Sequence, residues 1–102
     1  MKNAAVGDHI AVDPVVSCGH CYACRTGRHN VCKTVNVLGV HRDGGYQEYV
    51  AVEQDQLHQL PKDLPWEIAA TVEPYSIGAQ VAHQGRLTGD DTVLICGAGP
   101  IG

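Results

Sequence analysis

The chain has 102 residues, of which 44% are hydrophobic and 18% charged, so it is long enough for one globular domain and too short for two. Its formal net charge is −4 and its seven Lys and Arg residues are scattered, which argues against a nucleic-acid-binding protein. No apolar run approaches the roughly 20 residues of a membrane helix and no targeting segment is visible, so we expect a cytoplasmic protein with reduced thiols and no membrane partner.

The first predicted element is a strand at residues 9–13. Ile10 and Val12 alternate with their neighbours and therefore share one face, and Pro14 ends the pattern. No earlier segment of the sequence has the pattern of a strand. The pairing partner of this strand is therefore not apparent from the sequence.

The next segment, residues 17–33, holds four of the five cysteines with the spacing C-x2-C-x2-C-x7-C. The two C-x-x-C motifs share one cysteine, so three sulfurs come from one short, tightly turned segment. The seven-residue gap is long enough for the chain to reverse direction and bring the fourth sulfur to the same ion. This spacing predicts an all-sulfur tetrahedral zinc site. Four protein ligands leave no coordination position for water or substrate, so the site is expected to be structural. Its ligands would be Cys18, Cys21, Cys24 and Cys32.

Two other structures fit the same four cysteines. They could form two disulfides, although no signal peptide is visible and the fifth cysteine would be left over. They could also hold an iron–sulfur cluster, but the last gap is seven residues and Lys33 follows where the bacterial ferredoxin pattern has a gap of three and a proline. His20 and His29 lie in the same segment, and we interpret them as surface residues because four cysteines already complete the shell.

Further strands are predicted up to residue 60. Residues 34–41 are β-prone, Asp43-Gly44-Gly45 is a turn signal, and residues 46–52 alternate clearly. A short strand follows at residues 57–60 and ends at Pro61. The first sixty residues are therefore expected to be mainly β, with the cysteine segment inserted among the strands.

The pattern then changes to helices. Asp63 is expected to cap a short helix over residues 65–70, and Glu73-Pro74 to open a second helix that stops at Gly85. Residues 92–96 form a continuous apolar run, which is typical of a strand buried in a parallel sheet, and Cys96 at its end is expected to be a small buried residue.

A glycine-rich motif follows that run. Gly97, Gly99 and Gly102 have the G-x-G-x-x-G spacing of a dinucleotide-binding turn, in which backbone N–H groups approach a pyrophosphate closely. The helix that should follow the motif and the acidic residue expected about 20 positions later are not in the sequence. We therefore interpret the motif as genuine and the binding site as incomplete.

Several titratable residues have simpler explanations than catalysis. A carboxylate at the position of Glu73 is by default a favourable charge at the start of a helix. His41, His58 and His83 are isolated from one another, and each is expected to be a packed or solvated histidine.

Taken in order, the four-cysteine segment, Asp43-Gly44-Gly45-Tyr46-Gln47-Glu48-Tyr49, Glu73-Pro74 and the glycine motif resemble the medium-chain, zinc-dependent alcohol dehydrogenase family. The branch they are most similar to holds the sorbitol, threonine and sugar-acid dehydrogenases. The resemblance implies a partial GroES-like catalytic domain over residues 1–72 that carries the zinc-binding lobe 17–33. It also implies a linking helical region over 73–91 and the start of a Rossmann domain over 92–102.

The resemblance further implies a structural Zn2+ on the four cysteines, with Glu73 as a ligand of a catalytic Zn2+ and Gly97, Gly99 and Gly102 at NAD or NADP. The implied substrate is a small alcohol, polyol or sugar acid, and the implied assembly a homo-oligomer. In the family, the other catalytic-zinc ligands precede the equivalent of Gly7, and the sequence does not contain them. We therefore expect a fragment of such an enzyme that is inactive alone. The alternative is a free-standing, zinc-stapled protein-interaction module.

Overall fold

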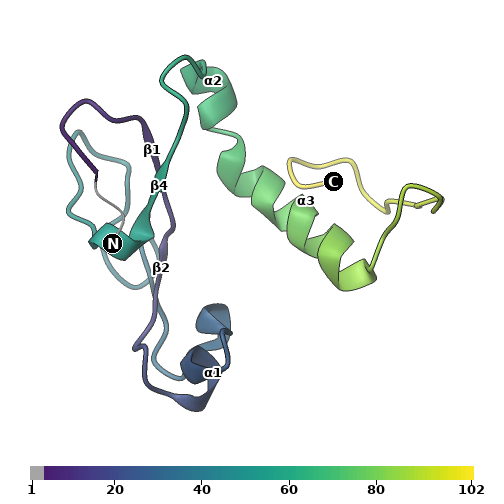
Figure 1. The fold of residues 1–102 in the computed structure, drawn as a ribbon, viewed down its shortest axis with the longest axis horizontal. Coiled ribbons are helices and arrows are strands. Elements are labelled where there is room, and N and C mark those ends of the chain that lie inside the picture. The colour runs from purple at the N-terminus through teal and green to yellow at the C-terminus, as the bar shows by residue number, and fades with distance from the viewer. Residues whose placement is uncertain (1–3) are drawn as a thin grey trace. The chain divides into compact units, whose positions relative to one another are not determined.

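The structure, a computed structural model, describes residues 4–102, and these fall into two compact units that divide between Gln59 and Leu60 (Figure 1). The first unit carries the strands and the cysteines, and the second carries the longest helix. Residues 1–3, with which the predicted domain 1–72 begins, lie outside the described part. None of the helices within residues 4–102 is long and apolar enough to cross a membrane.

The first unit contains two antiparallel strand pairs. Strand β1 (Ile10–Val12) pairs with β4 (Leu57–Gln59), with Ala11 opposite His58. Strand β2 (Val15–Val16) pairs with β3 (Asn36–Val37). The predicted strands at 9–13 and 57–60 are thus confirmed, and each supplies the other's partner. The sequence does not indicate this pairing, because the two strands are separated by 44 residues and local patterns do not specify which strands pair over such a distance.

Three short helices complete this unit. Helix α1 (Tyr22–Arg25) and the 3-10 helix η1 (His29–Val31) lie between β2 and β3, and the 3-10 helix η2 (Gln54–Gln56) leads into β4. Across residues 4–102 the buried side chains are few, and those in the first unit belong to Cys24, Cys32 and Gln56. The cysteine segment therefore has thiols where a larger domain would have an apolar core.

Gln56 ties η2 to the end of β1. Its backbone oxygen accepts the N–H of Asp13 at 2.8 Å, and its side-chain Nε2 donates to the carbonyl oxygen of Asp13 at 2.7 Å. Its Oε1 accepts the N–H of Glu53 at 3.0 Å, which closes a capping box on η2. This buried amide is therefore bonded at both ends, and it joins segments 43 residues apart in the sequence.

The predicted strand at 46–52 is wrong. These residues adopt no regular structure, and Tyr46 and Tyr49 are 108% and 87% exposed. The preceding loop closes on itself, since Gly39 donates to the carbonyl of Arg42 at 2.8 Å and a side chain on Gly44 would press against the Gly39 backbone. No strand within residues 4–102 lies beside 46–52 to take its backbone hydrogen bonds. Alternation alone does not create a strand without that partner.

The second unit is built on α2 (Trp66–Ala69) and α3 (Val72–Gly85). Pro74 lies in the first turn of α3, as predicted. The helix α3 ends at Gly85, as predicted, and Arg86 follows it in a left-handed conformation with φ 53°. The cap predicted for α2 is wrong, because its N-cap is Pro65 rather than Asp63.

The predicted buried strand at 92–96 is also wrong. These residues form no strand, and Val93, Leu94 and Ile95 are 52%, 87% and 65% exposed. Cys96 is exposed rather than buried. A parallel strand needs neighbours on both sides, and the described part of the second unit contains no other strand. The first strand of a Rossmann domain is therefore not formed here.

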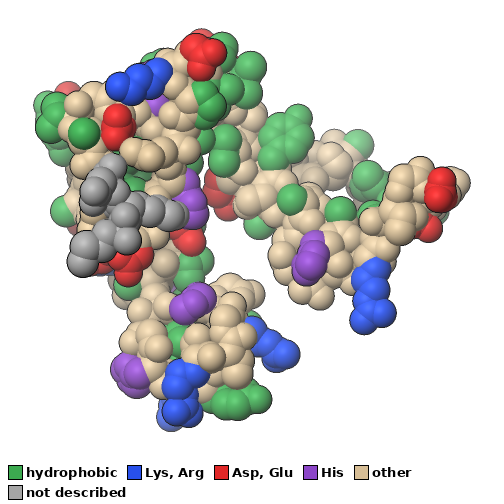
Figure 2. Space-filling view, in the orientation of Figure 1, with side chains coloured by type: hydrophobic (Ala, Val, Ile, Leu, Met, Phe, Trp, Pro, Cys, Tyr) green, Lys and Arg blue, Asp and Glu red, His purple; other side chains and the backbone are tan. Residues whose placement is uncertain are grey.

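Apolar side chains lie on the outside of the second unit (Figure 2). Trp66 and Ile68 of α2 and Tyr75 and Val81 of α3 are all more than half exposed. The buried side chain of this unit within the described residues is Ala69. Its apolar surface is thus largely uncovered.

Candidate metal centre

Three local elements place the four clustered cysteines. Cys18 follows β2, Cys21 is the N-cap of α1, Cys24 lies within α1, and Cys32 is the C-cap of η1. Two of the turns between them require glycine. Gly19 and Gly27 have φ angles of 73° and 78°, a left-handed conformation that other residues adopt at a cost.

The four sulfurs converge on one point. All four Sγ atoms lie within 4.8 Å of one another, with Cys21–Cys24 at 3.5 Å and Cys18–Cys24 and Cys21–Cys32 at 3.9 Å. A tetrahedron of sulfurs about 2.3 Å from a zinc ion has edges of about 3.8 Å. The sulfurs are far beyond the roughly 2.05 Å of a disulfide bond, and all four cysteines are free thiols. The donor set and its spacing therefore fit zinc, and the two-disulfide alternative is not what the structure shows.

Backbone amides surround these sulfurs. The N–H of Cys18 donates to Cys32 Sγ at 3.3 Å, and the N–H of Cys21 donates to Cys18 Sγ at 3.4 Å. Such donors favour the thiolate. The backbone N–H of Cys24 lowers the pKa of the Cys21 thiol from 9.0 to about 6, and the backbone N–H of Cys18 lowers the pKa of Cys32.

Cys24 has the opposite shift to Cys21 and Cys32. Cys24 is 5% exposed, as Cys32 is, and burial raises the pKa of the Cys24 thiol to about 11. A dication beside it offsets that cost, because a metal ion deprotonates the thiols that coordinate it.

The two histidines of the lobe are not in the cluster. His20 donates from Nδ1 to the carbonyl oxygen of Cys18 at 2.7 Å, and His29 is hydrogen-bonded through Nδ1 to the Ser17 hydroxyl at 3.0 Å. Both are exposed, which agrees with the prediction that they are surface residues. His41, His58 and His83 are exposed as well.

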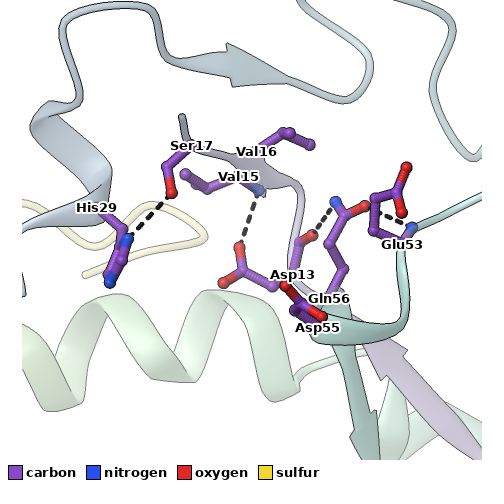
Figure 3. Close-up of a pocket in the computed structure, with 8 residues that line it drawn as sticks. All are labelled: Asp13, Val15, Val16, Ser17, His29, Glu53, Asp55 and Gln56. Atoms are coloured by element: carbon purple, nitrogen blue, oxygen red, sulfur yellow. Dashed lines mark hydrogen bonds between the residues drawn. The ribbon is translucent and has the colours of Figure 1, made fainter. Parts of the chain in front are cut away.

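A pocket of about 340 Å³ lies beside the lobe in the first unit, and no motif in the sequence indicated it (Figure 3). Two of its three carboxylates serve the fold, since Asp13 accepts the N–H of Val15 at 2.8 Å and Glu53 caps η2; the third belongs to Asp55. Ser17 and His29 face them from the lobe side. Gln56 joins segments 13–17 and 53–56, which line the pocket, and no local pattern in the sequence indicates that contact.

Glu73 is exposed in the first turn of α3. The described residues place no set of His, Cys, Asp or Glu ligands around it, and the metal-binding group that they do contain is the cysteine cluster. The role predicted for Glu73 thus stays a prediction.

The glycine motif forms a tight loop. Gly97 has φ 120°, Gly102 donates to the carbonyl of Gly99 at 3.1 Å, and a side chain on Gly102 would collide with the carbonyl oxygen of Gly97. Gly102 therefore has to be glycine in this loop. The strand and the helix that would flank a dinucleotide-binding turn are not formed around it in the described residues.

Comparison with known proteins gives matches along the whole chain. The profile of the alcohol dehydrogenase GroES-like domain matches residues 1–62. The starvation-sensing protein RspB of Escherichia coli K12 is 50% identical over 102 residues, which is 100% of this chain and 30% of that protein. Sorbitol dehydrogenase of Bacillus subtilis 168 is 41% identical over 98 residues, which is 95% of this chain and 28% of that protein.

Solved structures match in the same way. The alcohol dehydrogenase rspB of Escherichia coli CFT073, crystallised with NADH, has a TM-score of 0.89 and 51% identity over 94% of this chain and 28% of its own. Galactitol-1-phosphate dehydrogenase of Escherichia coli has a TM-score of 0.79 and 31% identity over 84% of this chain and 25% of its own. The chain thus spans less than a third of the length of the proteins it matches.

Proposed function

Because the chain belongs to the medium-chain, zinc-type alcohol dehydrogenase family, we propose that it forms part of an NAD(P)-dependent dehydrogenase that oxidises a small alcohol, polyol or sugar acid. The observation that carries this proposal is the cluster of four thiols, all within 4.8 Å of one another, inside the region that matches the GroES-like domain. Sorbitol and L-galactonate-5-dehydrogenases among the relatives support the substrate class.

Within such an enzyme, Cys18, Cys21, Cys24 and Cys32 would hold a structural zinc that orders residues 17–33. Glu73 would be a ligand of a second, catalytic zinc, which supplies Lewis-acid polarisation of the substrate oxygen when bound. Gly97, Gly99 and Gly102 would lie against the pyrophosphate of NAD or NADP, at the start of a nucleotide-binding domain over 92–102. Reduced thiols favour a cytoplasmic location.

We expect the 102-residue polypeptide to be inactive by itself. Its metal-binding group has four protein ligands, and a tetrahedral ion with four protein ligands has no position for a substrate oxygen. Glu73 alone is one carboxylate without partner ligands in the described residues. A dehydrogenase assay of this polypeptide with NAD+ or NADP+ over polyols and sugar acids should therefore show no turnover.

A chimera tests the proposal positively. Residues 1–102 would replace the matching segment of the Bacillus subtilis sorbitol dehydrogenase, with which they share 41% identity. We expect the chimera to reduce NAD+ with sorbitol and Glu73→Gln in it to lower kcat/KM by at least about 100-fold, because a metal ligand is lost. Glu67→Gln, an exposed carboxylate in α2, is the matched control and should retain the chimera's activity.

Two outcomes of this experiment would contradict the proposal. A chimera that folds and binds zinc but does not reduce NAD+ would favour the zinc-stapled interaction module instead. Equal activity of the Glu73→Gln and Glu67→Gln chimeras would remove Glu73 from the catalytic site.

A further inference from the structure

Two of the four clustered thiols are placed unlike the others. The sulfurs of Cys21 and Cys24 are 3.5 Å apart, closer than the 3.9 Å of Cys18–Cys24 and Cys21–Cys32. Cys18 and Cys21 are partly exposed, whereas Cys24 and Cys32 are each 5% exposed. An oxidant in solvent therefore reaches Cys18 and Cys21 before the buried pair, and Cys21 is the one of these two whose sulfur lies 3.5 Å from the buried Cys24 sulfur.

The backbone holds these two residues in a compact arrangement. Cys21 is the N-cap of α1 and Cys24 lies within the same helix, so one helical turn separates them in a C-x-x-C step. Dithiol–disulfide enzymes use this spacing because a disulfide closes across it. Cys32, by contrast, comes from the far end of the lobe, after η1.

We propose that Cys21 and Cys24 form a reversible redox pair, whose oxidation to a disulfide removes two of the four ligands and releases the zinc ion. The inference rests on the structural zinc of the proposed function. With only Cys18 and Cys32 left, the ion has half of its sulfur shell, and the order that it gives to residues 17–33 is lost with it.

A peroxide is the oxidant class that balances this reaction. The Cys21 sulfur attacks one peroxide oxygen, the O–O bond breaks, and the sulfenic acid of Cys21 forms with release of one water after protonation. The Cys24 sulfur then attacks the Cys21 sulfur, the S–O bond breaks, and a second water leaves. Each sulfur gives up one electron, and the peroxide takes both. A dithiol reductant returns the two electrons and restores the ligands.

The experiment treats the zinc-loaded 102-residue polypeptide with equimolar hydrogen peroxide, in a Cys96→Ser background that removes the exposed fifth thiol. A colorimetric chelator reports released zinc, and mass spectrometry of tryptic peptides reports the disulfide. Trypsin leaves the first three cysteines in one peptide, residues 3–25, and Cys32 in another, residues 29–33. We expect about one zinc released per disulfide, a disulfide inside peptide 3–25, and rebinding of zinc after reduction.

Two variants identify the pair even where they no longer hold zinc. Cys18→Ser should still form the disulfide inside peptide 3–25, and Cys24→Ser should form none there. A disulfide that reaches Cys32 first, a disulfide retained in Cys24→Ser, or zinc that stays bound while the disulfide forms would overturn the redox proposal. If the purified polypeptide holds no zinc, the proposed structural zinc site is contradicted. The tryptic peptides would still show whether Cys21 and Cys24 form the disulfide.

Discussion

At the residue scale, the metal ligands could be predicted and the residue that braces the fold could not. The spacing of Cys18, Cys21, Cys24 and Cys32 sufficed because a zinc shell needs little beyond donor type and a loop that curls. Gln56 lies in a polar stretch that looks like an ordinary loop. Its bonds reach Asp13, 43 residues away, and such a contact is determined by the tertiary fold alone.

The Gln56 contacts predict a large effect for one polar residue. Gln56→Ala leaves the carbonyl of Asp13 and the N–H of Glu53 without their side-chain partners in a buried position. We expect the free energy of unfolding of the zinc-bound polypeptide to fall by about 1–3 kcal/mol, measured by urea denaturation.

Gln47→Ala is the control for that measurement. Gln47 also donates one side-chain hydrogen bond to a carbonyl, that of Gly44, but it is exposed. Its loss should cost at most about 0.5 kcal/mol, as for other surface substitutions. Equal losses for the two variants would show that Gln56 does not brace η2 against β1.

At the element scale, both helices predicted for the second unit are formed, whereas two of the predicted strands are not. The start of α3 followed from local signals, since Pro74 lies in its first turn. Residues 46–52 and 92–96 have strand patterns but form no strands, because a strand also needs a partner for its hydrogen bonds. The strand β1 forms because β4 is there to pair with it.

The end of α3 yields a prediction of its own. Arg86 donates to the carbonyl of His83 at 3.1 Å and Leu87 to that of Ala82 at 3.0 Å, which is the pattern of a Schellman cap with Arg86 at the left-handed position. A side chain there costs about 1 kcal/mol relative to glycine. Arg86→Gly should therefore stabilise the helix by about that amount, seen as a higher midpoint of helix melting by circular dichroism.

Arg86→Ala separates this backbone effect from the loss of the charge. Alanine carries the same left-handed strain as arginine, so its melting midpoint should stay near that of the parent chain. If Arg86→Ala gains as much as Arg86→Gly, the guanidinium rather than the backbone limits the helix.

At the scale of the whole molecule, the family match confirms the resemblance to the alcohol dehydrogenases. The sequence could indicate this family because several of its motifs occur in the same order along the chain. The domain boundaries, the homo-oligomer and the roles of Glu73 and the glycines stay predictions. Large apolar side chains remain exposed in both units, among them Tyr49 and Leu94, at 87% each. Such surface is typical of chains that have further protein to pack against.

We infer that a zinc ion on four thiolates orders the first unit. The supporting geometry is a set of sulfurs within 4.8 Å of one another where few other side chains are buried. In small zinc modules, binding of the Zn2+ ion contributes about 10–16 kcal/mol of apparent free energy. Removal of the ion by a chelator should therefore unfold residues 17–33.

The most direct test is elemental analysis of the polypeptide purified without added metal. The measurement compares the parent chain with two matched variants, Cys24→Ser and Cys96→Ser. We predict about one zinc per chain in the parent and in Cys96→Ser. Cys24→Ser, which removes one of the two buried ligands, should lose its zinc on dialysis. Iron with sulfide in place of zinc, or equal zinc content in the two variants, would contradict the account.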